Sequence, residues 1–201
     1  MNEAKIIFSA PELELMKNAE FILTKNKVMQ KMKHILETLQ NELAGTSHMD
    51  LTGAGQPVFN TPPKVSRGEN YRGLPYLVLD YPRKFEGQNI FAVRNFFWWG
   101  NLYSTTLQLA GEYKRIHLTN IITSYNHFAA ADYFIGVNAD PWQHHFEVDN
   151  YRLIKELSAD QFAKICNAME HIKIGKKWTL DDVQSAAENM KQSWKFLLKC
   201  L

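Results

Sequence analysis

The fold is decided by residues 89–110, which read NIFAVRNFFWWGNLYSTTLQLA. Two apolar runs flank Gly100-Asn101, a dipeptide that favours a two-residue hairpin turn with glycine in its first central position. This register places Arg94 opposite Leu107, because side chains alternate between the two faces of a strand. One face of the predicted hairpin then carries Ala92, Arg94, Phe96, Trp98, Tyr103, Thr105, Leu107 and Leu109.

Helical patterns precede the hairpin and strand patterns surround it. Ser9-Ala10-Pro11-Glu12 is a helix-start signal, and apolar steps of three and four predict a helical region over 10–44 with a break near Lys25-Asn26. Residues 45–70 are expected to form a loop. The run 76–81, which we expect Pro82 to end, predicts a strand before the hairpin.

The stretch 112–157 is ambiguous in its periodicity. Ile116 and Leu118 fit a strand face and residues 127–131 a helix, while 133–137 and 145–149 fit further strands. The C-terminal region 158–201 predicts two helices. One begins at the capping pattern of Ser158 and runs through Ile172, and the other is capped by Thr179.

These patterns together predict one α+β domain over residues 1–201. Its sheet region spans 71–150, with the hairpin 89–110 at the centre of an antiparallel sheet. The long N-terminal helix and the two C-terminal helices are expected to pack against that sheet.

The composition excludes several classes of protein. The 23 basic and 21 acidic residues give a net charge of +2 without a concentrated basic segment, so we expect no nucleic-acid partner. No run approaches the ~18 apolar residues of a membrane span, so no membrane association is expected. Cys166 and Cys200 show neither zinc-ligand spacing nor a disulfide framework, which favours a cytoplasmic protein.

Arginines and aromatic residues concentrate between residues 71 and 103, which hold ten of the 25 aromatic residues and three of the six arginines. Arg94 interrupts an apolar strand face, so its guanidinium needs a carboxylate or an anionic ligand. We expect Arg94 to be largely buried and either paired with Asp80 or open to a ligand. The sequence thus predicts a binding site for a small anionic or aromatic metabolite, formed by Arg67, Arg72, Arg83, Arg94 and Asp80, with Tyr71, Tyr76 and Trp98 as walls.

Two other interpretations remain open at this point. Exposed aromatic residues such as Trp99 could form a homodimer interface in a protein without enzymatic activity. Alternatively, His145 and Glu147, with Asp149 on the same strand face, could hold a metal ion in a metal-dependent enzyme, helped by a distant histidine such as His171 or His117. The sequence assigns no reaction and contains no Walker or GxGxxG motif for a cofactor.

A short motif adds a resemblance to a known family. Pro62-Pro63-Lys64, between the N-terminal helix and the expected strands, is similar to a segment of uncharacterised bacterial YktB-like proteins. The resemblance covers about residues 20–110. It implies an α+β fold and brings no catalytic residues.

Overall fold

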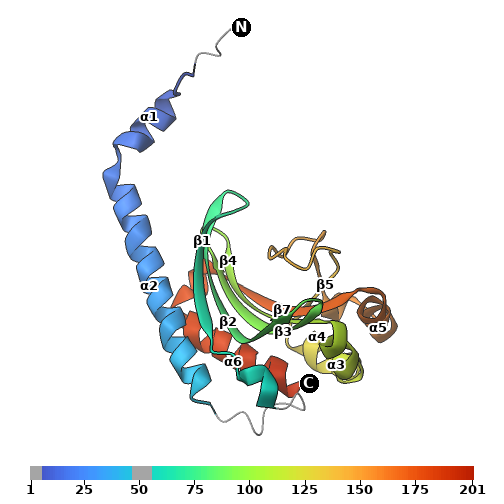
Figure 1. Cartoon of the computed structure of the whole chain (residues 1–201). Helices are drawn as coiled ribbons and strands as arrows, with labels where there is room; N and C mark the ends of the chain where they lie inside the picture. Colours follow the sequence, from blue (N-terminus) through green and yellow to red (C-terminus); the bar gives the residue numbers. More distant parts are fainter. Residues whose placement is uncertain (1–5, 47–55) are drawn as a thin grey trace.

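An antiparallel sheet forms the centre of the computed structural model, which describes residues 6–46 and 56–201 (Figure 1). In that part of the chain the sheet has seven strands in the order β1-β2-β3-β4-β7-β5-β6. The strands are β1 (Lys64–Tyr71), β2 (Leu74–Glu86), β3 (Asn89–Trp98), β4 (Leu102–Ala110), β5 (Phe134–Gly136), β6 (Tyr151–Leu153) and β7 (His171–Thr179). The prediction of an α+β fold around an antiparallel sheet is therefore confirmed.

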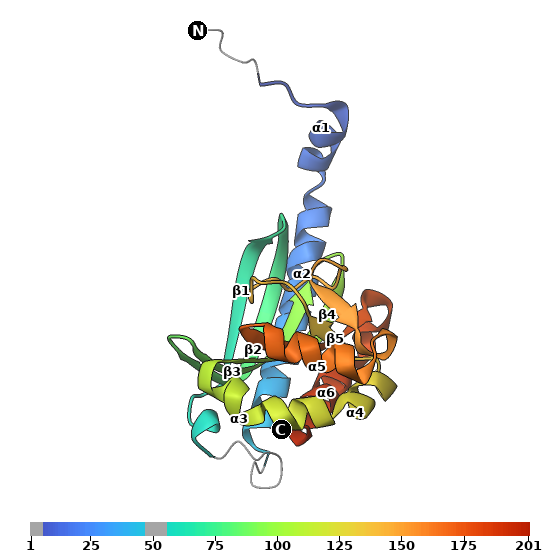
Figure 2. The ribbon, with the colours of Figure 1, turned by 90° about the vertical axis from the view of Figure 1, so that its right-hand side faces the viewer.

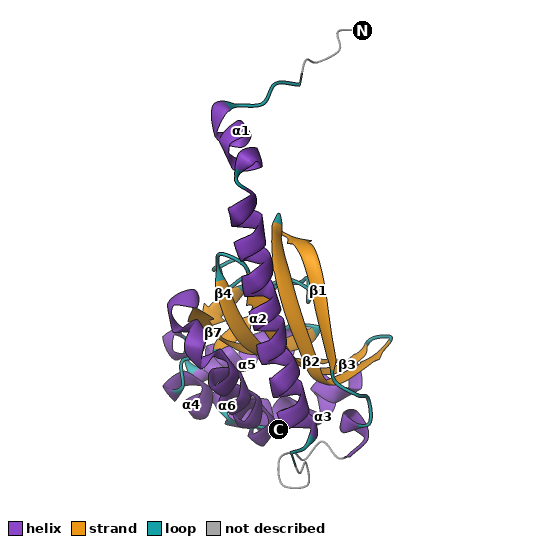
Figure 3. Ribbon diagram, turned by 90° about the vertical axis from the view of Figure 1, so that its left-hand side faces the viewer, coloured by secondary structure: helices purple, strands orange, loops and turns teal. Residues whose placement is uncertain are grey.

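Helices cover the sheet and its edges. Figure 3 shows α2 lying across one face of the sheet, and Figure 2 shows α3 and α5 together on another side of the molecule. The α-helices are α1 (Ala10–Lys17), α2 (Ala19–Ala44), α3 (Gly111–Thr123), α4 (Tyr125–Ala130), α5 (Ala159–Ala168) and α6 (Ala186–Lys199). In the described residues, the 3₁₀ turns η1 (Gln56–Phe59), η2 (Ile154–Glu156) and η3 (Leu180–Ser185) each lie between a helix and a strand.

The main core lies between the sheet and helices α2 and α6. The buried stripe of α2 consists of Met29, Met32, Leu36, Leu39 and Leu43, whose steps of three and four place them on one helix face. Trp194 of α6 is fully buried, and its indole N–H donates to the backbone carbonyl of Tyr81 at 2.6 Å. The strand side chains in this core include Leu77, Leu79, Phe91, Val93, Phe97, Tyr103, Leu107 and Leu109.

The central hairpin has a different register from the predicted one. Trp98 pairs with Leu102 and Arg94 with Thr106, so the connecting loop is the three residues 99–101. Gly100 adopts φ +70°, as the third position of a type II turn requires, and the Asn101 N–H donates to the Trp98 carbonyl at 3.1 Å. The predicted two-residue turn is therefore wrong by one residue, and every side chain of β4 changes face relative to β3.

Three boundaries in the N-terminal half also differ from the prediction. The helix breaks at Asn18 instead of Lys25-Asn26, because the Asn18 side chain accepts the Phe21 N–H and caps α2. Part of the expected loop 45–70 is β1, while residues 47–55 of it lie outside the described residues. β2 continues beyond Pro82, which sits at a register shift where the ladder does not require its missing N–H.

The C-terminal half differs in three elements. Ile116 and Leu118 belong to helix α3, whose buried residues His117 and Ile121 are one helical turn apart. Residues 145–149 form an irregular segment that ends in a turn instead of a strand. The helix that begins at Ser158 ends at Ala168, and residues 171–179 form strand β7, which the prediction missed.

Candidate functional site

The sheet face opposite α2 and α6 is covered by an irregular segment. Three neighbouring rows of paired residues cross β3, β4 and β7 on this face: Ile90–Ala110–His171, Ala92–Gln108–Lys173 and Arg94–Thr106–Gly175. Residues 138–150, between β5 and β6, lie over these rows. We call this sheet face the covered face and residues 138–150 the cover (Figure 1).

Interlocking rings fill one end of the covered face. Tyr71 packs edge-on against Phe96 and Trp98, with ring centroids 5.7 Å and 5.0 Å apart. The Trp98 indole N–H donates to the backbone carbonyl of Tyr71 at 3.1 Å, and the Tyr76 ring lies 5.5 Å from Phe96. The structure thus brings Tyr71, Tyr76 and Trp98 together, as packed neighbours of one another.

Tyr71 also anchors the cover to the sheet. Its phenol oxygen accepts the backbone N–H groups of His144 at 2.7 Å and of His145 at 3.0 Å. Two accepted bonds use both lone pairs, so the Tyr71 hydroxyl hydrogen can donate to Nδ1 of His145 at 3.0 Å. Nε2 of His145 lies 3.1 Å from a carboxylate oxygen of Asp149.

Arg94 forms an internal ion pair. Its Nε and Nη2 donate to the two carboxylate oxygens of Asp80 at 2.7 Å and 2.9 Å, and both side chains are only 14% exposed. The Nη1 group faces Nε2 of His144 at 3.1 Å. Burial and the Arg94 charge hold the pKa of His144 well below its ordinary value, so this ring is neutral and accepts the bond. Of the two expected arrangements for Arg94, the structure shows the pair with Asp80.

The other predicted arginines lie apart from Arg94 and have their own partners. Arg67 sits opposite Leu77, on the face toward α2, and binds Glu69. Arg83 donates to the Pro62 carbonyl at 2.8 Å. The four arginines therefore do not converge on one site.

Arg72 lies at the candidate metal ligands. His145, Glu147 and Asp149 offer one ligand atom each, all within 4.8 Å of one another, and we call them the 145–149 cluster. Arg72 has φ +49° in the turn between β1 and β2, and its Nη1 binds Glu147 at 2.9 Å. Its Nη2 is 3.1 Å from Nε2 of His145. The guanidinium is thus already a counter-ion of Glu147 within this cluster.

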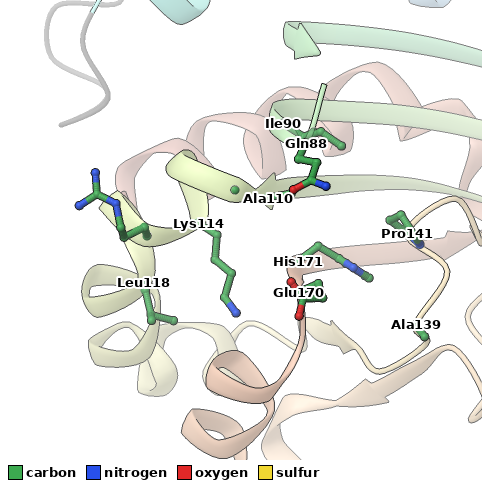
Figure 4. A pocket seen from close by; sticks show the side chains of 11 residues that line it. Gln88, Ile90, Ala110, Lys114, Leu118, Ala139, Pro141, Glu170 and His171 are labelled. Carbon is green, nitrogen blue, oxygen red and sulfur yellow. The ribbon is translucent and has the colours of Figure 1, made fainter. Parts of the chain in front are cut away.

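A cavity of about 560 Å³ opens at the other end of the covered face (Figure 4). Its floor is the row Ile90–Ala110–His171, and its walls come from α3, the cover and the turn before β7. Figure 4 shows Lys114 reaching from α3 toward Glu170 and His171. The lining residues are Gln88, Ile90, Ala110, Gly111, Lys114, Arg115, Leu118, Ala139, Pro141, Glu170 and His171.

Two buried nitrogen atoms near this cavity have no hydrogen-bond partner among the described residues. Nε2 of His171, a residue 5% exposed, belongs to the cavity floor, and Nε2 of Gln108 lies in the next row. Burial, followed by the charges of Lys173 and Lys114, lowers the pKa of His171 to about 4, so its ring is neutral at pH 7. Unpaired buried polar atoms are costly, and a ligand could satisfy them.

Lys173 lies in the same row as Gln108, beneath the cover. Its ammonium donates to the backbone carbonyl of Gln143 and lies 5.1 Å from the centre of the Tyr151 ring. Burial, together with the charge of Arg94, lowers the pKa of Lys173 to about 7. A partly protonated amine thus lies one row behind the cavity floor.

Sequence reasoning missed the residues that line this cavity. One usable signal was the alternation of His171 and Lys173 with Ile172 and Ile174, which is a strand pattern at the start of β7. The predicted helix through Ile172 obscured it. No sequence pattern around Lys114 indicated a binding site, because Lys114 reaches the cavity only through the packing of helix α3.

Comparisons with known proteins add no assignment. No family model matches the chain, and no curated protein is similar to it. The resemblance to YktB-like proteins, which was based on Pro62-Pro63-Lys64 and on the order of the elements around it, stays a prediction. In the part of the chain that the structure describes, no helix has the length and apolar character to cross a membrane.

Proposed function

We propose that the chain binds a small carboxylate- or phosphate-bearing molecule with an apolar body in the cavity floored by Ile90, Ala110 and His171. The observation that carries this proposal is the unpartnered Nε2 of His171, which is buried in the cavity floor. The cavity volume of about 560 Å³ falls in the range of small-molecule sites.

The charges around the cavity favour an anion. The residues that line the cavity include two cations, Lys114 and Arg115, and one carboxylate, Glu170. Lys173 adds partial positive charge from the next row of the sheet. Lys114 donates to the backbone carbonyls of Asn167 and Met169, which leaves one of its three N–H groups for a ligand. The apolar lining residues Ile90, Ala110, Leu118, Ala139 and Pro141 suit an apolar or aromatic body.

The ligand class is the one that the sequence suggested, but the proposed site is at the opposite end of the covered face. Arg94 and Arg72 are engaged with Asp80 and Glu147, and the rings of Tyr71 and Trp98 pack against each other. A ligand there would have to break a buried ion pair. The binding function involves no assigned reaction, and we place it in the cytoplasm because both cysteines are free and buried.

Calorimetric titration with phenyl phosphate, benzoate and neutral phenol tests the proposal. Phenyl phosphate and benzoate should bind, and phenol should bind more weakly. Lys114→Gln should weaken binding of both anions by at least about tenfold, because a charge-assisted hydrogen bond contributes about 1.5–3 kcal/mol. Arg67→Gln is the matched control, since it removes one positive charge on the other sheet face.

Circular dichroism must show that both variants keep the fold. Absence of heat with all three probes at millimolar concentration would refute the proposal. Equal weakening in Lys114→Gln and Arg67→Gln would refute it as well, because binding would then follow net charge and not the cavity.

A further inference from the structure

The N-terminal arm, which we define as residues 6–28, exposes an unusual amount of apolar surface. Ten of the fourteen large apolar side chains that are exposed in the described part of the chain lie in the arm. Isolated exposed apolar residues are normal, but a contiguous group marks an interaction surface. The ten are Ile6, Ile7, Phe8, Leu13, Leu15, Met16, Phe21, Ile22, Leu23 and Val28.

The arm is exposed because it extends past the sheet. The buried stripe of α2 begins at Met29, and Figures 1 and 3 show the first turns of α2 and all of α1 projecting beyond the strands. Within the described structure, α1 buries none of its side chains, although Ser9 and Glu12 form a capping box at its start. A helix of eight residues is marginal in water without packing.

We propose that two copies of this chain associate through their arms, antiparallel, about a two-fold axis near Asn18. In this arrangement α1 of each copy covers the projecting turns of its partner's α2. A register in which paired residue numbers add up to 37 places Leu15 opposite Ile22. The same register places Lys17 opposite Glu20, so that the charges at this contact attract.

The surface area fits such a dimer. The ten side chains are 38–86% exposed and together present on the order of several hundred Å² of apolar surface. A standard protein interface buries roughly 800 Å² per partner. The intrachain pair of Lys17 with Glu14 is highly exposed, so it exchanges readily for an intermolecular one.

The charge of the arm favours a second copy over a membrane surface. It carries three acidic residues (Glu12, Glu14, Glu20) and three basic residues (Lys17, Lys25, Lys27). Helices that lie on anionic membranes are rich in Lys and Arg on the polar face. The charges of the arm sum to zero, with acidic residues mainly toward one end and basic residues mainly toward the other. The arm is therefore complementary in charge to an antiparallel copy of itself.

A charge-swap experiment on the full chain tests the register. Glu20→Lys places two lysine side chains together at both symmetry-related contacts of the two-fold pair, and Lys17→Glu places two glutamates together at the same contacts. Each variant alone should dimerise at least about tenfold more weakly than the parent in sedimentation velocity. An equimolar mixture of the two variants should recover the dimer, because each of the two contacts between unlike chains then joins one lysine to one glutamate.

Four outcomes decide the proposal. A dimeric parent, two weakened variants and recovery on mixing support it. A monomeric parent overturns it, as does a parent dimer that neither substitution weakens. Binding of the monomeric parent to vesicles of phosphatidylcholine and phosphatidylserine, without self-association, would assign the arm to a membrane and also overturn it.

Discussion

Replacing Lys173 by methionine should change how the stability of this protein depends on pH. Lys173 is 2% exposed and lies beneath the cover, where the charged or titratable groups that interact with it include Arg94, Asp140, His144 and His171. Burial is the main cause that lowers its pKa from 10.5 to about 7. Methionine has a similar length and carries no charge to desolvate.

The sign follows from proton binding. Between pH 7 and 10.5 the unfolded chain keeps the lysine proton that the folded chain has released, so the free energy of unfolding rises with pH in this window. With these two pKa values, the contribution of Lys173 to stability should rise by about 2 kcal/mol from pH 6.5 to 8.5. Well below pH 6.5 the slope disappears, because both states are protonated.

Urea unfolding of the parent and Lys173→Met at several pH values between 6.5 and 8.5 measures this difference. The parent should gain stability relative to the variant by about 2 kcal/mol over the window. Lys177→Met is the control, because Lys177 is on the same side of β7 but exposed, and its curve should run parallel to that of the parent. Parallel curves for the parent and Lys173→Met would refute the reasoning.

Three further predictions concern the surroundings of the covered face. Arg94→Met should destabilise the fold by about 3–5 kcal/mol in urea unfolding, because it leaves Asp80 buried without its cation. A second change of Asp80 to asparagine should recover part of this lost stability. If it recovers none, the ion-pair explanation is wrong. Gly111→Ala should lower the free energy of unfolding by about 1–3 kcal/mol in the same assay, since Gly111 has φ +57° and a Cβ there would clash with Asn89. An unchanged urea midpoint would show that the backbone at residue 111 relaxes to accept the Cβ. Arg72→Ala should let zinc bind the 145–149 cluster at least about tenfold more tightly than in the parent, because it removes the competing guanidinium. Calorimetric titration with zinc measures both affinities. Equal affinities would show that the cluster is not a metal site.

The sequence was informative where the local signal was strong. The apolar runs around Gly100-Asn101 located both strands of the central hairpin, and the capping patterns at Ser9 and Ser158 located two helix starts. Turn length was not determined by that signal, because a glycine and an asparagine fit turns of two or three residues. A difference of one residue was enough to place Thr106 and Gln108 beside Arg94 in place of leucines.

The candidate site was less predictable than the fold, for a geometric reason. The walls of the cavity come from the 88–90, 110–118, 139–141 and 170–171 segments, which are far apart in the chain. The hydrophobic periodicity of one segment does not indicate which distant segments it will contact in the fold. The Arg94–Asp80 pair could be anticipated because a buried guanidinium requires an acidic partner, and Asp80 was available on a neighbouring strand.

The bond between Tyr71 and the cover has a consequence for hydrogen exchange. The amides of His144 and His145 both donate to the Tyr71 phenol oxygen. Their exchange rates therefore measure how often the cover lifts from the sheet, separately from global unfolding. These two amides thus provide an internal reporter, within a single protein, of any ligand that closes or opens the segment above the cavity.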